Sequence, residues 1–208
     1  MKTTIKVLVV LALALATFTQ HSTASAGSKL RFSGDTARAS FTSVDPSGCI
    51  TTDVLVFAND TLSQSPPGNG DRNSGVTLFI SQVDTCNFIL LMDAFGFAFI
   101  APADFQVSSQ LNSATLNATI NVEDFVSGNT FDVFVNLTWT GSGPLSRDSS
   151  KFHSQTPHCQ FHSSFKGSSR FAEASGTVSD GTVNFTPDPS WDGGLISAKG
   201  GQMTIGCT

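Results

Sequence analysis

The strongest constraint on the fold is a pair of alternating segments in the middle of the chain. Over 113–123 and again over 130–140, apolar residues occupy every second position and polar residues fill the others. Side chains of a β-strand point to opposite faces in turn, so this period of two predicts two strands, each with one buried and one solvated face. The connecting Ser127-Gly128-Asn129 is typical of a hairpin. The inward residues are Ala114, Leu116, Ala118, Ile120, Val122, Phe131, Val133, Val135, Leu137 and Trp139.

The rest of the chain shows the same preference. Further strands are predicted at 36–44, 50–59, 76–83 and 88–103, and shorter ones at 151–154, 159–166, 170–179, 183–186 and 195–205. Turn residues separate them, 61–74 is predicted to be a long exposed loop, and no segment has a sustained helical period. The sequence therefore predicts an all-β protein, an antiparallel β-sandwich of about 8–11 strands, with a closed β-barrel as the alternative.

The segment 88–103 is the most apolar stretch after residue 26. Phe95, Phe97 and Phe99 share one face of the predicted strand, and Gly96 and Ala98 share the other. Because both faces are apolar, we expect a central strand between two packed layers. The alternative is an exposed phenylalanine ridge that contacts a partner or lipid.

The first 26 residues have the pattern of a secretory signal peptide. Lys2 and Lys6 precede the apolar run 7–16, and Ala24-Ser25-Ala26 has the small residues of a cleavage site. The apolar run is half as long as a membrane-spanning helix needs. We therefore expect a single β domain over 27–208 that is secreted, extracellular or periplasmic, with no transmembrane anchor in the mature chain.

Composition limits the partners. Removing Lys2 and Lys6 with the signal leaves 9 basic residues against 16 acidic ones, a formal charge of −7. No basic residues cluster along the sequence, so binding of nucleic acid or of an anionic membrane is not expected. The chain has 18 Phe but no Tyr, which favours packing over display. No cofactor motif occurs, and no cofactor is expected.

Four cysteines, Cys49, Cys86, Cys159 and Cys207, remain after cleavage. An even number in a secreted chain predicts disulfides. If 50–59 and 76–83 form an antiparallel hairpin, its open end brings Cys49 next to Cys86. The pairing Cys159–Cys207 then follows by elimination.

All three mature histidines, His153, His158 and His162, fall within ten residues, which makes them candidate ligands for zinc or copper. The alternative is three solvent-facing histidines on a hairpin. No nucleophile–base motif is present, so a binding or structural protein with an unknown extracellular partner is predicted. The alternative is a hydrolase or isomerase that pairs a histidine with Asp132 or Asp148. Glycosylation sequons begin at Asn59, Asn117, Asn136 and Asn184.

Overall fold

The computed structural model describes residues 28–64, 70–157, 159–186 and 191–207, and the regular structure in these ranges is entirely β-strand. The strands are β1 (Ser28–Val44), β2 (Ile50–Gln64), β3 (Gly70–Asp84), β4 (Ile89–Phe99), β5 (Phe105–Val107), β6 (Ser113–Asp124), β7 (Thr130–Gln155), β8 (Cys159–Ser179) and β9 (Trp191–Cys207). The described ranges contain no helix long and apolar enough to cross a membrane. The predicted signal peptide lies outside them.

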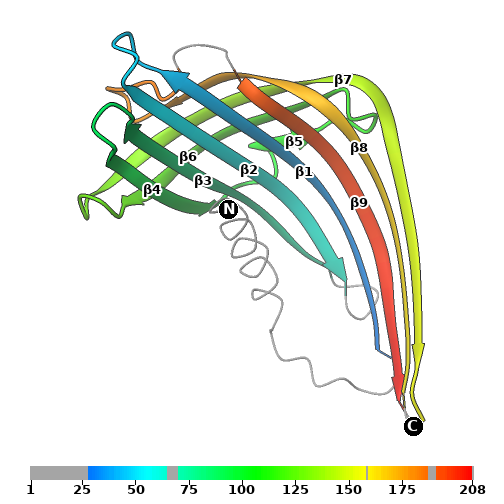
Figure 1. The fold of residues 1–208 in the computed structure, drawn as a ribbon. Coiled ribbons are helices and arrows are strands. Elements are labelled where there is room, and N and C mark those ends of the chain that lie inside the picture. The colour runs from blue at the N-terminus through cyan, green and yellow to red at the C-terminus, as the bar shows by residue number, and fades with distance from the viewer. Residues whose placement is uncertain (1–27, 65–69, 158, 187–190, 208) are drawn as a thin grey trace.

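All nine strands belong to one antiparallel sheet, in the order β4-β3-β2-β1-β9-β8-β7-β6-β5. β4, at one end of this order, also pairs with β6, which is next to the other end, so the sheet curls back on itself (Figure 1). Gly96 permits this approach, because a Cβ atom there would lie 2.6 Å from the side chain of Val122. The all-β antiparallel prediction is confirmed. The two layers that face each other across the core belong to one continuous sheet.

The core fills the space inside this curled sheet. β6 and β7 pair from Ser113↔Thr140 to Glu123↔Thr130, and their inward residues are buried except for the partly buried Phe131. The hairpin predicted from alternation is therefore confirmed, and its polar face, including Asn117 and Asn136, is exposed. Inward residues of β1, β2, β3, β8 and β9 complete the same core.

Several strands are longer than the sequence indicates. The predicted loop at 61–74 is wrong over most of its length, because β2 continues to Gln64 and β3 begins at Gly70. Segments expected to be separate merge into β7 and β8, whereas 183–186 forms only an isolated bridge, Ser179↔Asn184. Backbone pairing between long neighbours holds these stretches extended where apolar alternation is absent.

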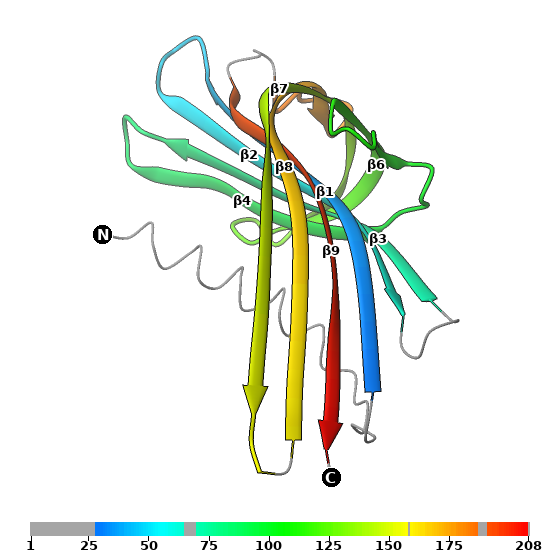
Figure 2. The same cartoon turned by 90° about the vertical axis from the view of Figure 1, so that its right-hand side faces the viewer.

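Four strands reach well past the closed part of the sheet. β4 ends opposite Gly75 and β6 begins opposite Thr140, whereas β1, β9, β8 and β7 continue side by side (Figure 2). We call residues 28–35, 198–207, 159–170 and 143–155 of these strands the extension. The ends of β2 and β3 flank it, since Arg31 pairs with Gln64 and Gln64 with Gly70.

The prediction that 88–103 forms a strand covered on both faces is wrong. The inner face of β4 is buried at Ala94, but Phe95, Phe97 and Phe99 are 37%, 47% and 77% exposed on the outer face. The described chain places no second layer over them. The ring of Phe95 packs on Phe79 of β3 instead, and the rings of Phe97 and Phe99 pack on each other, with 4.9 Å between the centroids of each pair.

The disulfide between Cys49 and Cys86 is present, as the hairpin of β2 and β3 predicts. Cys159 and Cys207 are paired directly opposite each other on β8 and β9, and Cys159 is disulfide-bonded. The side chain of Cys207 lies outside the described residues, so Cys159–Cys207 stays a prediction that this register supports.

Candidate functional site: a basic concave face

The inward side of the core continues into the extension as a polar concave surface. On β1, Ala37 is buried, and the positions that share its face toward the strand end are Asp35, Ser33, Arg31 and Lys29. The strand register extends each of these into a row across the sheet. The rows are Asp60–Asp35–Ala198–Ser168–Arg147, Arg72–Leu62–Ser33–Gly200–Lys166–Ser149, Gln64–Arg31–Gln202–Ser164–Lys151 and Lys29–Thr204–His162–His153. We call this surface the inner face.

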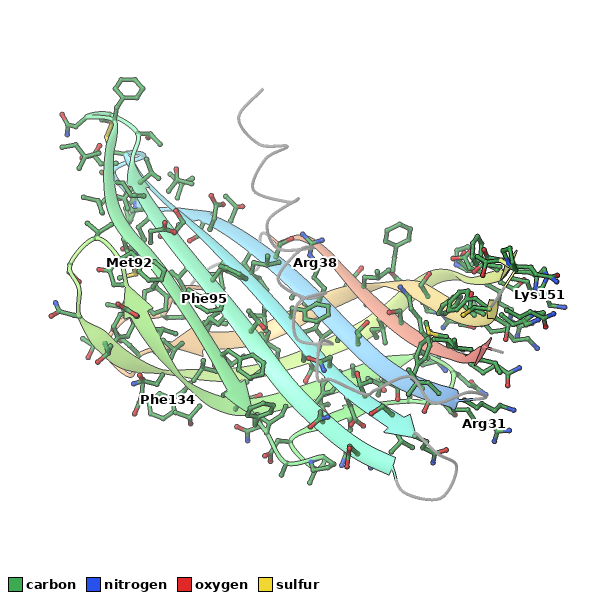
Figure 3. The ribbon with its side chains drawn as sticks, turned by 90° about the horizontal axis from the view of Figure 1, so that it is seen from below. Arg31, Arg38, Met92, Phe95, Phe134 and Lys151 are labelled. Carbon is green, nitrogen blue, oxygen red and sulfur yellow. A yellow bond between two sulfur atoms is a disulfide. The ribbon has the colours of Figure 1, made fainter. Side chains whose placement is uncertain are left out.

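Basic residues concentrate on the inner face. It holds seven of the nine Lys and Arg residues in the described ranges: Arg72, which pairs with Asp60, and Lys29, Arg31, Arg147, Lys151, Lys166 and Arg170. Figure 3 shows Arg31 and Lys151 at one end of the molecule, far from Met92 and Phe134. Arg170 lies at the upper border, where its guanidinium donates to Asn112. In three dimensions, therefore, the expectation that no basic residues cluster is wrong.

Many acidic residues lie elsewhere, although Asp35 and Asp60 belong to the first row of the inner face. No Lys or Arg occurs between Arg72 and Arg147, and this stretch contains Asp84, Asp93 and Asp124. Asp124 closes the turn between β6 and β7, and Asp84 the turn between β3 and β4, both at the end opposite the extension. A chain of net negative charge is thus strongly polarised, with its cations at one end.

A pocket of about 560 Å³ marks the point where the inner face meets the closed part of the sheet. Asp35, Asp60 and Arg72 line one side, and Lys166 and Ser168 line the other. A smaller hollow of about 330 Å³ follows toward the strand ends, between Arg31, Lys166 and Gln202. The inner face is therefore an open trough lined by charged and hydrogen-bonding side chains.

The two carboxylates of the pocket sit in opposite electrostatic environments. Arg72 and Asp60 form the one ion pair among the described residues, and the Ser74 hydroxyl donates to Asp60 at 2.8 Å. The hydrogen bond from Arg72 lowers the pKa of Asp60, although burial opposes this shift. Burial raises the pKa of Asp35, the charge of Asp60 raises it further, and Arg72 offsets part of the rise.

We expect Asp35→Asn to stabilise the protein at pH 7 by up to about 1 kcal/mol. A raised folded-state pKa means that the ionised Asp35 costs stability at neutral pH, and this cost vanishes below the ordinary aspartate pKa, where both states are protonated. Urea denaturation at pH 7 and near pH 3 measures the difference. Asp60→Asn is the matched control with the opposite sign, since the lowered pKa of Asp60 contributes stability that acid removes. A loss of stability at pH 7 in both variants would contradict this account.

The opposite face of the extension carries most of its apolar side chains. Alternate positions there carry Leu30 and Phe32 of β1, Met203 and Ile205 of β9, and Phe152, Phe161 and Phe165 of β7 and β8. The rings of Phe32 and Phe165 are 5.5 Å apart, and those of Phe152 and Phe161 are 5.8 Å apart. Because the phenylalanines lie on this opposite face, the four rows of the inner face contain no Phe or Trp.

The structure brings two of the three predicted histidines together. His153 and His162 are directly opposite on β7 and β8, and their Nδ1 atoms are 3.0 Å apart. His158 lies outside the described residues. In the described ranges, no group of three or more His, Cys, Asp and Glu side chains could hold a metal ion.

Neither predicted carboxylate partner is placed beside a histidine. Asp132 accepts a hydrogen bond of 2.8 Å from Asn121 on the solvated face of the β6–β7 hairpin. Asp148 is paired with Gly167, so it alternates away from the face that carries His153. The described residues thus lack the His–Asp arrangement that the enzyme alternative requires.

Comparison with known proteins adds little to this geometry. Neither a family model nor a curated protein matches the sequence. Among solved structures, the chain is similar to a protein assigned as AttH from Nitrosomonas europaea, with 12% identity, a TM-score of 0.30 and 86% of this chain aligned to 52% of that one. It is also similar to an acetoacetate decarboxylase-like enzyme from Sphingomonas wittichii RW1, with 10% identity, a TM-score of 0.27 and coverage of 91% and 96%. The chain therefore spans about half the length of the first of these structures.

Proposed function

We propose that this protein is a secreted binding protein whose inner face holds an acidic polysaccharide outside the cell. The observation that carries the proposal is the gathering of six cations, besides the ion-paired Arg72, on one concave face of a chain whose formal net charge is −5. The signal-like leader supports secretion. The disulfide between Cys49 and Cys86 agrees with an oxidising compartment.

The cations of the inner face are available to a ligand. Apart from Arg72, no Lys or Arg of the described chain has a carboxylate within ion-pair distance. Residues two apart on a strand are about 7 Å from each other, so the rows from Arg147 to Lys29 span about 20 Å. An extended polyanion could therefore contact several cations at once, which a compact ligand could not.

The polar neighbours favour a carbohydrate. Hydrogen-bonding side chains stand between the cations: Ser33, Ser149, Ser164, Ser168, Gln202 and Thr204. An acidic polysaccharide presents both anionic groups and hydroxyls to such a surface. The shortage of large apolar side chains in these rows disfavours a lipid, and the absence of Phe and Trp disfavours stacked nucleic-acid bases.

We expect polygalacturonate to bind the purified protein and uncharged dextran not to bind. Arg31→Glu and Lys166→Glu should each weaken binding about tenfold or more, equivalent to about 1.4 kcal/mol, and added NaCl should weaken it further. Both side chains are exposed, so the fold should tolerate the change. Isothermal titration calorimetry measures the affinities.

Arg38→Glu is the matched control. It makes the same charge change on β1, but Arg38 lies between the fully buried Ala37 and Ala39 and so points to the outer face. Equal losses in Arg38→Glu and Arg31→Glu would show that only net charge matters and would overturn the proposal. Tighter binding of single-stranded DNA or anionic vesicles than of polygalacturonate would replace the proposed partner.

A further inference from the structure

The end of the inner face contains a second arrangement of side chains, independent of the polysaccharide proposal. His153 and His162 occupy directly opposite positions on β7 and β8, close to the connection between these strands. Both side chains are exposed. Their ring centroids are 4.1 Å apart, with 37° between the ring planes, and the Nδ1 atoms are 3.0 Å apart.

Two Nδ1 atoms at this distance are close enough to share a proton or to bind the same ion. A hydrogen bond between them requires that one carries the proton and the other offers its lone pair. When both rings instead carry the proton on Nε2, both Nδ1 atoms offer a lone pair, and their separation allows one metal ion to bind both. The antiparallel pairing of β7 and β8 places the two residues next to each other before any ion arrives.

The spacing of the nitrogens selects among metals. With metal–nitrogen bonds of about 2.0–2.1 Å, two nitrogens 3.0 Å apart subtend about 90° at the ion. Tetrahedral Zn²⁺ would hold them about 3.3 Å apart, whereas neighbouring equatorial ligands of tetragonal Cu²⁺ meet near a right angle. Cu²⁺ is also the divalent ion of the first transition row that nitrogen ligands bind most strongly.

We propose that His153 and His162 form a two-histidine site for Cu²⁺, with water at the remaining coordination positions. Lys29 shares the row of the two histidines, and Lys151 lies in the adjacent row. Their positive charges weaken the attraction for any cation, so an ion with high intrinsic affinity for imidazole is needed. No other described side chain is required for the site.

Titration of untagged protein carrying His21→Ala, so that the leader histidine cannot contribute, tests the site. We expect one Cu²⁺ per chain, and an axial electron paramagnetic resonance spectrum with hyperfine splitting from two nitrogens. His153→Ala and His162→Ala should each lose at least tenfold in affinity, and Zn²⁺ should bind at least tenfold more weakly than Cu²⁺. Because both rings are exposed, circular dichroism should show that these variants remain folded.

His158→Ala is the matched control, since it removes a neighbouring histidine that the proposed site does not use. Retained affinity in this variant supports a two-histidine site. A loss equal to that of His153→Ala would establish a three-histidine site and overturn the proposal, as would full Cu²⁺ affinity in the double variant His153→Ala/His162→Ala. Equal affinities for Zn²⁺ and Cu²⁺ would refute the inference from the nitrogen spacing.

Discussion

Trp139→Ala is expected to lower the free energy of unfolding by about 4 kcal/mol, the usual cost of removing a large aromatic side chain from a core. Trp139 is completely buried on β7, and it heads the fully buried side chains by volume. Its indole Nε1 also donates a hydrogen bond of 2.9 Å to the backbone carbonyl of Arg38. Truncation would leave both a cavity and a carbonyl without its partner, and both effects destabilise the folded state.

Urea denaturation followed by far-UV circular dichroism measures this loss, because the substitution itself removes a fluorophore. Phe134→Ala is the matched control: Phe134 lies on the same strand, but it is 52% exposed on the outer face. Its removal should cost less than about 1 kcal/mol. Similar losses in the two variants would mean that the inward and outward faces of β7 are not distinguished as described.

The sequence suffices to predict elements in which burial imposes a pattern. β6 and the first half of β7 bury alternate residues from Ala114 to Trp139, so their period of two gives the strands, their faces and their pairing. The same hairpin reasoning for β2 and β3 places Cys49 beside Cys86, and that disulfide is present. In both cases the information is local, or depends on one antiparallel pairing.

The extension could be predicted only in part: the sequence indicates strands at 151–154, 159–166 and 195–205, but not that they continue into the strands of the core. Gly143-Pro144 in β7 and Gly200-Gly201 in β9 suggest turns that would interrupt these strands. These stretches are strands because neighbouring strands pair with their backbones, an effect that no single segment reveals. The phenylalanines of β4 illustrate the converse error, since an apolar face predicts burial only where a second layer exists to cover it.

The basic face was missed for a related reason. Apart from Arg72, its cations come from three separate stretches, 29–31, 147–151 and 166–170, which only the register of β1, β9, β8 and β7 brings together. One signal was available: the 74 residues from 73 to 146 contain no Lys or Arg. When basic residues are confined to a few segments of the chain and these segments pair in one sheet, the positive charge is concentrated on one part of the structure.

Gly176→Ala is expected to destabilise the protein by about 3 kcal/mol or more, because it combines two separate costs. Gly176 has φ +130°, a backbone conformation that L-residues rarely adopt. It also pairs with Leu137 on β7, and a Cβ atom there would lie 2.0 Å from the carbonyl oxygen of Asn136. Since the obstructing atom is backbone, β7 and β8 would have to separate next to the core residues Leu137 and Val178.

Gly128→Ala separates the two costs. Gly128 also has a positive φ, +74°, but it lies in the turn between β6 and β7, and a Cβ atom there would meet nothing within 4 Å. This variant should lose only the conformational term, about 1 kcal/mol. Thermal and urea denaturation of both variants measure the difference. If Gly176→Ala lost no more than Gly128→Ala, the strands would have room for a side chain at residue 176, and the close pairing of β7 with β8 at the end of the core would be refuted.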